Sequence, residues 1–394
     1  MAGPLDGIRV IDVSAMVSGP LATMILGDQG ADVIKVEPPG VGDLVRAFGT
    51  RRAGVPAIFA TTNRNKRSLV LDLKSERGRA LLERLVAGAD VFVQNFRPGA
   101  VERMGIGEPA LRAIKPDLVY VSISGFGERG PYVGKRVYDP VVQALSGLAT
   151  IQADAATGRP RMMRTIVPDK LTAVTAAQAI TAALVARERT GVGQHVRLAM
   201  LDATVAFLWP EGMASHTFLD VDEEDWRPNR VRDLIYETAD GYITVGVVSD
   251  AEWRGLVRVL EQPALLEDER FRTPSRREKN AEARMSLTAD ALRTRTSREW
   301  LERLDAEEVP CAPVVTRDEL VTHPQIVANE LLVESTHPHA GRMRQPRPAA
   351  RFGTTPAAIR RPAPVHGEHT DEVLAELGCS SSEIAELRSA RIVS

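Results

Sequence analysis

The segment RTIVPDKLTAVTAAQAITAALVARERTGVGQH, residues 164–195, places one carboxylate, Asp169, directly behind Pro168. The Ala, Thr, Val and Leu residues that follow predict a helix to about Thr190, ended by Gly191. An Asp at a helix start stabilises it by about 0.5–2 kcal/mol, which by itself would explain this residue. A nucleophile is the alternative, because small neighbours leave room for a substrate. A carboxylate in this position can attack a thioester carbonyl and form a mixed anhydride.

Two local effects would support Asp169 as a nucleophile. The helix dipole is expected to lower the pKa of its carboxyl group and keep it ionised. The first turn of the helix is expected to leave backbone N–H groups free to hold a developing oxyanion.

A glycine-rich loop, GFGERG at residues 125–130, matches the spacing of a dinucleotide-binding turn. Pro131 and the following PYVGKRVYDP carry no helical pattern, so a pyrophosphate would lack a helix N-terminus, and we expect no NAD. GPYVGKR is one residue short of a phosphate loop, and Arg136 stands where Ser or Thr would hold magnesium, so we expect no ATP. Gly125, Gly127 and Gly130 are instead expected to let the loop approach a ligand and support an oxyanion.

Basic residues gather at predicted strand ends and loops of the first half of the chain. Singly, each is best explained as a solvated surface charge. Together they would suit a ligand with several phosphates, and Asn95 and Phe96 lie beside them, the ring being able to stack on a planar base. The basic residues are Arg46, Lys66, Arg67, Lys74, Arg97, Arg103 and Arg136.

Other common site chemistries find no support in the sequence. The seven histidines form no metal-binding helix pattern, and HGEHT at 366–370 lies in a Pro- and Gly-rich segment, so we expect no metal. The sequence has no G-x-S-x-G motif for a serine hydrolase.

Alternating β-branched runs and helical patterns predict the scaffold. Strands at 8–13, 31–37, 67–73, 90–96 and 118–124 alternate with helices such as 18–30 and 75–89, and a further strand follows at 195–200. We therefore expect an α/β fold with a parallel sheet covered on both faces. A polar stretch near residue 221 and a hairpin at 236–248, with Asp240-Gly241 as its turn, predict a smaller α+β domain after a linker.

The composition of the chain limits the kinds of partner that the protein is expected to bind. The 394 residues carry a net charge of −2, which argues against nucleic acid or an anionic membrane as the main partner. The N-terminal residues do not have the pattern of a signal peptide, and no apolar run reaches the roughly 18–20 residues of a membrane span. Two cysteines, Cys311 and Cys379, are too few for a disulfide framework, so we expect a cytoplasmic enzyme.

Many collinear segments resemble the class III coenzyme A transferase family, which also contains carnitine CoA-transferase, formyl-CoA transferase and the α-methylacyl-CoA racemases. The segments are PLDGIRVIDVS, GPLATMILGDQGADVIKVE, NRNKRSLVLDLKSERG, VQNFRPGAVERMG, YVSISGFGERGPY, YDPVVQALSG, the Asp169 segment, RTGVGQHVRLAMLDA and APVHGEHTDEVLAELG. They span nearly the whole chain, which makes the resemblance specific.

The resemblance implies a Rossmann-like large domain and an interlocked homodimer. The residue pattern predicts a large CoA-binding domain at 1–205, a linker at 206–224 and a small domain at 225–330, and the resemblance implies that the segment 331–394 returns to the large domain. The resemblance makes Asp169 the catalytic aspartate of transfer from an acyl-CoA to a free carboxylic acid, through an aspartyl anhydride and an aspartyl-CoA thioester. The positions matching residues that contact coenzyme A are Val17, Ser18, Leu71, Lys74, Asn95, Phe96, Arg103, Met104 and Arg136.

Three departures bear on the activity. Pro38 stands where the family often has a basic residue, and Arg46 is the candidate replacement. The racemases carry a histidine where this chain has Tyr138, and tyrosine has a reference pKa of about 10, so two-base proton exchange is disfavoured. No glycine run like that of formyl-CoA transferase occurs between residues 205 and 235, so the resemblance does not assign formyl or oxalate specificity.

Two alternatives to CoA transfer stay open. The first is a racemase or epimerase of α-methylacyl-CoA, with Asp169 as one base and Tyr138 in the substrate pocket. The second is a non-catalytic protein that binds acyl-CoA. Phe207, Trp209, Met213 and Phe218 predict an apolar region near the linker, for which core packing is an equally good explanation.

Overall fold

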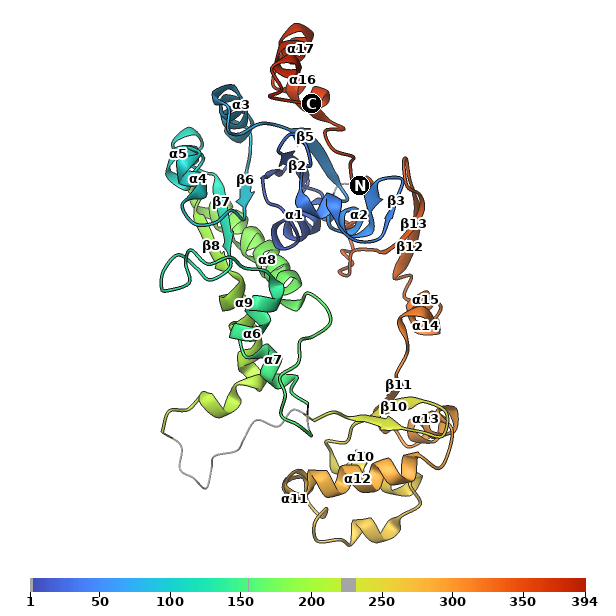
Figure 1. Cartoon of the computed structure of the whole chain (residues 1–394). Helices are drawn as coiled ribbons and strands as arrows, with labels where there is room; N and C mark the ends of the chain where they lie inside the picture. The colour runs from blue at the N-terminus through green and yellow to red at the C-terminus, as the bar shows by residue number, and fades with distance from the viewer. Residues whose placement is uncertain (1–2, 155, 221–231) are drawn as a thin grey trace. The chain divides into compact units, whose positions relative to one another are not determined.

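The computed structural model describes residues 3–154, 156–220 and 232–394. The chain divides into two compact units, Met1–Asn229 with Leu331–Ser394, and Arg230–Glu330. Residues 221–231, which fall in the expected linker and at the start of the expected small domain, lie outside the described residues. Figure 1 labels most of the helices and strands named below.

A six-stranded parallel sheet forms the centre of the first unit, in the order β5-β2-β1-β6-β7-β8. Counted along the chain, this is the order third, second, first, fourth, fifth, sixth of doubly wound nucleotide-binding folds. The predicted parallel α/β sheet is therefore confirmed. Its strands are β1 (Arg9–Asp12), β2 (Asp32–Glu37), β5 (Lys66–Val70), β6 (Val91–Gln94), β7 (Val119–Ser124) and β8 (His195–Ala199).

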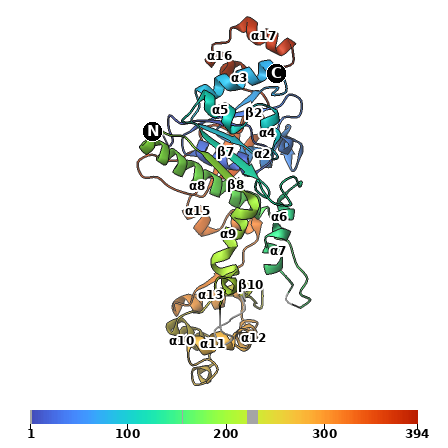
Figure 2. The ribbon, with the colours of Figure 1, turned by 90° about the vertical axis from the view of Figure 1, so that its left-hand side faces the viewer.

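Two helices, α1 (Ser18–Asp28) and α8 (Val167–Thr190), cover one face of the sheet. Figure 2 shows α8 beside β7 and β8. Small buried side chains such as Ala22, Ala173 and Ala176 let these helices pack closely against each other and against β1, β6 and β7. Gly191 ends α8 in the left-handed conformation, with φ of 72°. The Ala-rich run after Asp169 is thus explained by packing as well as by helix propensity.

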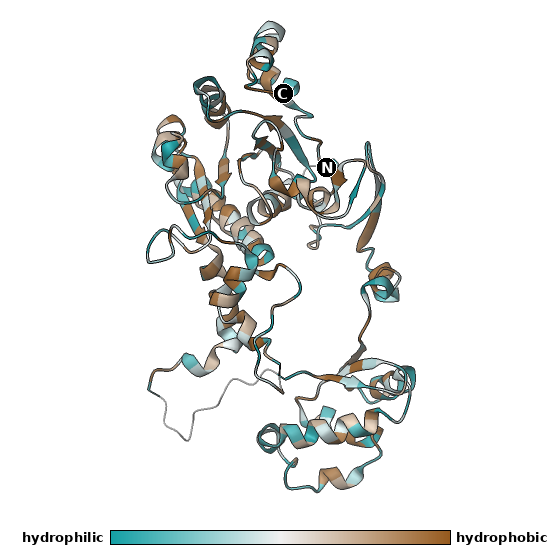
Figure 3. Ribbon diagram, viewed as in Figure 1, coloured by the Kyte–Doolittle hydropathy of each residue, from teal (hydrophilic) through white to brown (hydrophobic). Residues whose placement is uncertain are grey.

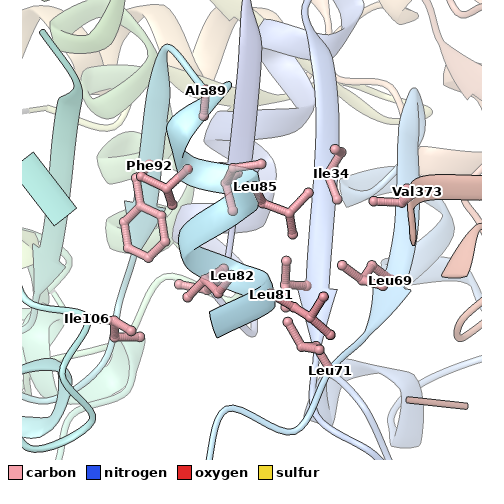
Figure 4. Packing of buried hydrophobic residues seen from close by; sticks show 14 of the residues in the cluster. Ile34, Leu69, Leu71, Leu81, Leu82, Leu85, Ala89, Phe92, Ile106 and Val373 are labelled. Carbon is pink, nitrogen blue, oxygen red and sulfur yellow. The ribbon is translucent and has the colours of Figure 1, made fainter. Parts of the chain in front are cut away.

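The other face carries α3 (Glu76–Ala87), α5 (Glu108–Ile114), α16 (Thr370–Glu376) and α17 (Ser381–Ser389). Figure 4 shows Leu81, Leu82 and Leu85 of α3 directed toward the sheet, with Val373 of α16 at the same core. The C-terminal residues therefore complete the core of the first unit.

The first unit contains further elements outside this sheet and the helices that cover it. They are η1 (Leu44–Ala47), β3 (Arg51–Arg52), β4 (Val55–Pro56), α2 (Ala57–Thr62), α4 (Ala100–Arg103), α6 (Asp139–Leu145), α7 (Leu148–Ile151), α9 (Met200–Gly212), η2 (Ala214–His216), β12 (Leu332–His337) and β13 (Gly341–Pro346).

The second unit has its own core around Trp253, Phe271 and Trp300. Its antiparallel sheet has the order β11-β10-β9, and β9 and β10 form the hairpin predicted around Asp240-Gly241. Its elements are β9 (Ile235–Glu237), β10 (Tyr242–Val245), α10 (Asp250–Val259), η3 (Pro263–Leu266), α11 (Pro274–Lys279), α12 (Ala281–Leu292), α13 (Ser297–Ala306), β11 (Cys311–Pro313), α14 (Arg317–Leu320) and α15 (Pro324–Ala328). No helix among the described residues has the length and apolar character needed to cross a bilayer.

Helix α1 begins at residue 18, where the predicted helix begins. A serine before an apolar helical run is a typical N-cap, but here Ser18 is the first helical residue and Val17 takes the cap position without a side-chain hydrogen bond. The Ser18 backbone N–H is thereby left at the open end of the helix, where it faces the candidate site.

Candidate active site

The loops that follow β1 and β6 meet at the point where the strand order reverses, which is where doubly wound sheets bind ligands. Asn95, just beyond β6, joins these loops. Its side-chain Oδ1 accepts the Ala15 N–H at 2.9 Å and its Nδ2 donates to the Ala15 carbonyl at 2.7 Å. Both ends of the Asn95 amide are therefore used to hold the loop after β1.

Asp169, in the first turn of α8, faces a cavity of about 150 Å³. Gly125 and Tyr138 contribute to its wall from the loop after β7, and Ser18 contributes from the start of α1. The remaining lining residues are Met16, Asn95, Phe96, Arg97, Pro98, Ile123, Ser124, Phe126, Val133, Lys135, Val137 and Met200. The residues predicted at the ligand that lie around the predicted nucleophile are therefore Ser18, Asn95, Phe96, Arg97, Gly125 and Tyr138.

The predicted pKa of Asp169 is wrong in direction. Burial, and then the neighbouring Asp139 carboxylate, raise the pKa of Asp169 to about 6, while the Ser18 backbone amide acts in the opposite sense. Burial is the largest of these effects, because desolvation strongly disfavours a charged carboxylate. Asp169 is still mostly ionised at neutral pH, and it is a stronger base than an exposed aspartate.

The first turn of α8 also offers no free amide, so the predicted oxyanion donors there are wrong. Asp139 occupies this turn from α6: its Oδ2 accepts the Asp169 N–H at 3.1 Å. Pro168 has no N–H to offer. The two other donors are satisfied locally, Val167 by the Thr165 carbonyl at 2.9 Å and Lys170 by the Ile166 carbonyl at 3.3 Å.

The helix that presents its N-terminus to Asp169 is α1, through the Ser18 amide. Gly19 lets this end of α1 approach the loop after β1, because a Cβ on Gly19 would overlap the Ser14 side chain. The positive end of the α1 dipole therefore lies at the nucleophile.

The three loop glycines have different surroundings. A side chain on Gly125 would overlap Val137, so Gly125 lets the two ends of the 125–137 loop come together. Gly127 and Gly130 have φ values of 86° and 88°, which only glycine adopts readily. The loop carries no helix before Asp139, as the sequence predicts.

A second hollow of about 990 Å³ adjoins the first and shares Phe96, Arg97 and Phe126 with it. It lies along the ends of β6, β7 and β8 and includes Arg129 and Arg197. Ligands of drug size occupy pockets of about 300–1,000 Å³, so only the larger hollow has room for the bulk of such a ligand.

Other predicted contacts lie outside both hollows. The Arg46 guanidinium pairs with both oxygens of Glu37 at 2.7 Å and stacks on Phe59, so its charge is already neutralised. Leu71 is buried and Met104 packs against the same core, which leaves their side chains little surface for a ligand. Val17 is buried, whereas Lys74, Arg103 and Arg136 are exposed. Contact of any of these residues with coenzyme A stays a prediction.

Two of the basic residues expected at the ligand are structural instead. Lys66 is fully buried and its Nζ lies 2.8 Å from Asp12 Oδ2. Arg67 is buried against Asp32, Glu372 and Glu376, and ties β5 to α16. Ion pairing inside the fold explains both.

Sequence reasoning missed Asp139 and Lys135. Asp139 is the first residue of α6 and is followed by a proline. This pattern predicts the start of a helix, but nothing in it indicates that Asp139 contacts Asp169. The sequence predicts Arg136 as a contact, but in the structure its neighbour Lys135 lines the cavity and Arg136 does not. No group of three or more His, Cys, Asp or Glu side chains suited to a metal ion occurs in the described ranges.

A site with a half-buried carboxylate at the switch point of a doubly wound sheet is typical of an α/β enzyme acting on a nucleotide-bearing substrate. The sequence model described as CoA-transferase family III matches residues 5–370. The chain belongs to this family, and it is a CoA-transferase that moves coenzyme A between an acyl-CoA and a carboxylic acid.

Several known proteins are similar to this chain over nearly its whole length. The human succinyl-CoA:glutarate CoA-transferase is 32% identical, with 99% of this chain and 90% of the relative covered. The succinate–glutarate CoA-transferase of Agrobacterium fabrum is 35% identical over 95% and 96% of the two chains. The formyl-CoA:oxalate CoA-transferase of Streptomyces coelicolor is 34% identical, and both chains are covered completely. A crystal structure of a CAIB/BAIF family protein from Brucella suis superposes with a TM-score of 0.82 at 30% identity, covering 96% of this chain and 100% of the other.

Proposed function

We propose that Asp169 is the nucleophile of CoA transfer and becomes acylated during each turnover. The observation that carries this proposal is the setting of its carboxylate: half-buried in a cavity, with a pKa raised to about 6, and faced by the Ser18 amide. Such a group is ionised at neutral pH and only weakly hydrated, as a nucleophile requires.

The transfer then runs through four acyl exchanges. An Asp169 oxygen attacks the donor thioester, the C–S bond breaks, and CoA thiolate leaves an aspartyl–acyl anhydride. The thiolate attacks the aspartyl carbonyl, which releases the donor acid and gives an aspartyl-CoA thioester. The acceptor carboxylate attacks that thioester, forming a second anhydride and freeing the thiolate. The thiolate finally takes the acceptor acyl group and regenerates Asp169.

Each step passes through a tetrahedral oxyanion next to Asp169. The Ser18 amide, at the positive end of α1, is the donor best placed to stabilise it, since the amides of α8 are occupied. Support from the Gly125–Gly130 loop stays part of the proposal. Of the three predicted loop glycines, Gly125 is the one that lines the Asp169 cavity.

We propose dicarboxylic acids as the substrate class. Three similar proteins are named for succinate, glutarate or oxalate, each with a second carboxylate, although one of them is also named for formyl-CoA, whose acid has none. In this chain Lys135 and Arg97 line the Asp169 cavity, and either cation can pair with a carboxylate distal to the reacting one.

We propose that the protein is a homodimer. Phe207, Trp209 and Phe218 are 59%, 40% and 74% exposed, so core packing within the described chain does not account for them. Figure 3 shows α9, which carries Phe207 and Trp209, as mostly hydrophobic. Exposed apolar patches of this kind mark interaction surfaces. The interlocked arrangement rests on the family resemblance, and a cytoplasmic location stays a prediction.

A trapping experiment tests the nucleophile. Enzyme incubated with succinyl-CoA is quenched with hydroxylamine or borohydride, and peptides spanning residue 169 are analysed by mass spectrometry. We expect a modification at Asp169 that is absent from Asp169→Asn, which should also lose transfer to glutarate. Transfer by Asp169→Asn at the wild-type rate would sink the assignment.

The racemase alternative is tested in the same sample run in deuterium oxide. No histidine is among the described residues that line the Asp169 cavity, and Tyr138 occupies the expected second-base position. We therefore expect no deuterium at the α-carbon of a 2-methylacyl-CoA. Exchange that depends on Asp169 would establish racemase chemistry instead.

A further inference from the structure

A buried ion pair, Lys35 with Asp43, lies behind the loop that leads from β1 to α1. The Lys35 Nζ and Asp43 Oδ2 are 2.9 Å apart, and the two side chains are 0% and 1% exposed. Lys35 comes from the middle of β2 and Asp43 from the residue before η1. Neither lines the Asp169 cavity, so the transfer mechanism described above uses neither.

Each member of the pair holds one backbone group of the loop. Lys35 Nζ donates to the Ser14 carbonyl at 2.9 Å, and Asp43 Oδ1 accepts the Met16 N–H at 3.0 Å. Between these two bonds, Ala15 is held by the Asn95 amide described above. Three consecutive residues are therefore fixed by side chains from β2, from the residue that caps η1 and from the residue after β6.

The loop needs this support because Met16 has a φ of 69°. A residue with a Cβ rarely adopts this left-handed conformation, which costs on the order of 1–3 kcal/mol and persists only where the surrounding structure enforces it. Ser18, whose amide faces Asp169, lies only two residues further along. A change in the Met16 conformation would therefore redirect the start of α1.

The Lys35–Asp43 pair is expected to hold the loop over the whole physiological pH range. Burial by itself would lower the pKa of Lys35, but the carboxylates of Asp12, Asp43 and Glu37 outweigh it and raise the pKa instead. The ammonium group thus remains charged throughout the physiological range, and its hydrogen bond to Ser14 is charge-assisted.

We propose that Lys35 and Asp43 are positioning residues for catalysis, which hold Met16 in its left-handed conformation and thereby aim the Ser18 amide at Asp169. This inference rests on the proposed role of Asp169. A misplacement of about 1 Å in such a group costs on the order of 10²-fold in rate.

The test compares two buried ion pairs of the first unit. Asp43→Asn keeps an oxygen for the Met16 N–H but loses the charge that pairs with Lys35. Asp28→Asn is the matched control, because Asp28 pairs with Arg64 at 2.7 Å with both side chains 5% exposed, at the opposite end of α1. Thermal unfolding measures the structural cost of each change, and kcat and KM for succinyl-CoA with glutarate are measured in parallel.

For Asp43→Asn we expect kcat to fall by about 10- to 100-fold with KM for succinyl-CoA changed by no more than about threefold. Asp28→Asn should lose comparable Tm but keep kcat near that of the wild type. If Asp43→Asn fails to fold, the double variant Lys35→Met/Asp43→Asn, which leaves no unpaired partner in this pair, carries the test with the same expected fall.

The outcomes separate the two proposals. If the wild type transfers CoA with dependence on Asp169 but the Asp43 or double variant keeps kcat, or loses no more than Asp28→Asn does, the positioning role is overturned and the nucleophile stands. If the wild type shows no transfer that depends on Asp169, both are overturned.

Discussion

Asp139 accepts the backbone N–H of Asp169 through its Oδ2, at 3.1 Å, and the same carboxylate helps to raise the pKa of the Asp169 side chain. One buried residue of α6 thus fixes the start of α8 and tunes the acid that α8 carries. Gln143 holds Asp139 in place from one turn further along α6, donating to its Oδ1 at 2.6 Å.

The pH dependence of transfer should reveal the effect of Asp139 on the pKa of Asp169. The nucleophile must be ionised, so kcat/KM is expected to fall as the pH drops through about 6, the raised pKa of Asp169. Asp139→Asn removes the negative charge, and the acid limb should move to lower pH. Tyr138→Phe is the control, because it leaves both carboxylates in place and should not move the limb. If the acid limb of Asp139→Asn lies at the same pH as in the wild type, or at a higher pH, Asp139 does not raise the pKa of Asp169.

Asp169→Asn should stabilise the protein while abolishing transfer. The pKa is about 6 in the fold against 3.8 for an ordinary aspartate, so the folded state binds more protons in between. Stability therefore decreases as the pH rises from about 4 to about 6 and stays lower above that. After a discount for partial exposure, the neutral variant should gain about 1–2 kcal/mol at pH 7.5 and nothing at pH 3.5. Melting curves at both pH values check this, and an equal gain at both would show another cause.

Gly125→Ala should impair the loop above Asp169. Its added methyl group would overlap Val137, so the ends of the 125–137 loop must separate, at a cost of about 1–3 kcal/mol. We expect kcat/KM to fall by about tenfold or more, since one wall of the cavity moves. The double variant Gly125→Ala/Val137→Ala makes room for the methyl group and should recover part of the loss. No recovery would mean that Gly125 acts by some other route than its fit against Val137.

Lys135→Met should change the choice of acid. If Lys135 pairs with the distal carboxylate of a dicarboxylic substrate, kcat/KM for glutarate should fall by about 10- to 100-fold. A monocarboxylic acid of similar length, such as valerate, lacks the partner group and should be affected little. Lys74→Met, a change at an exposed lysine outside the cavity, controls for general loss of charge. Equal losses for both acids would assign Lys135 to coenzyme A and not to the acid.

Light scattering coupled to size exclusion checks the homodimer. The wild type should elute at about twice the 42.9 kDa of one chain. Phe207→Ser/Trp209→Ser removes two exposed apolar side chains and should weaken assembly while leaving the fold intact by circular dichroism. A monomeric wild type at micromolar concentration would refute the proposal.

The sequence by itself determined the parallel sheet, the helix that begins near Asp169, the hairpin at Asp240-Gly241 and membership of the family. These features depend on local periodicity, turn chemistry and collinear motifs, all of which are readable along the chain. Asp169 could be singled out in the same way, because a lone carboxylate at the start of an apolar helix, together with the collinear family motifs, is visible along the chain.

The tertiary structure alone decided how that carboxylate is tuned and held. Its pKa direction depends on burial and on Asp139, which lies 30 residues earlier in the chain. Lys66 and Arg67 became ion pairs, and not ligand contacts, because Asp12 and Glu376 reach them from distant segments. Desolvation and charge pairing are set by what packs around a group, and a sequence pattern records only its near neighbours.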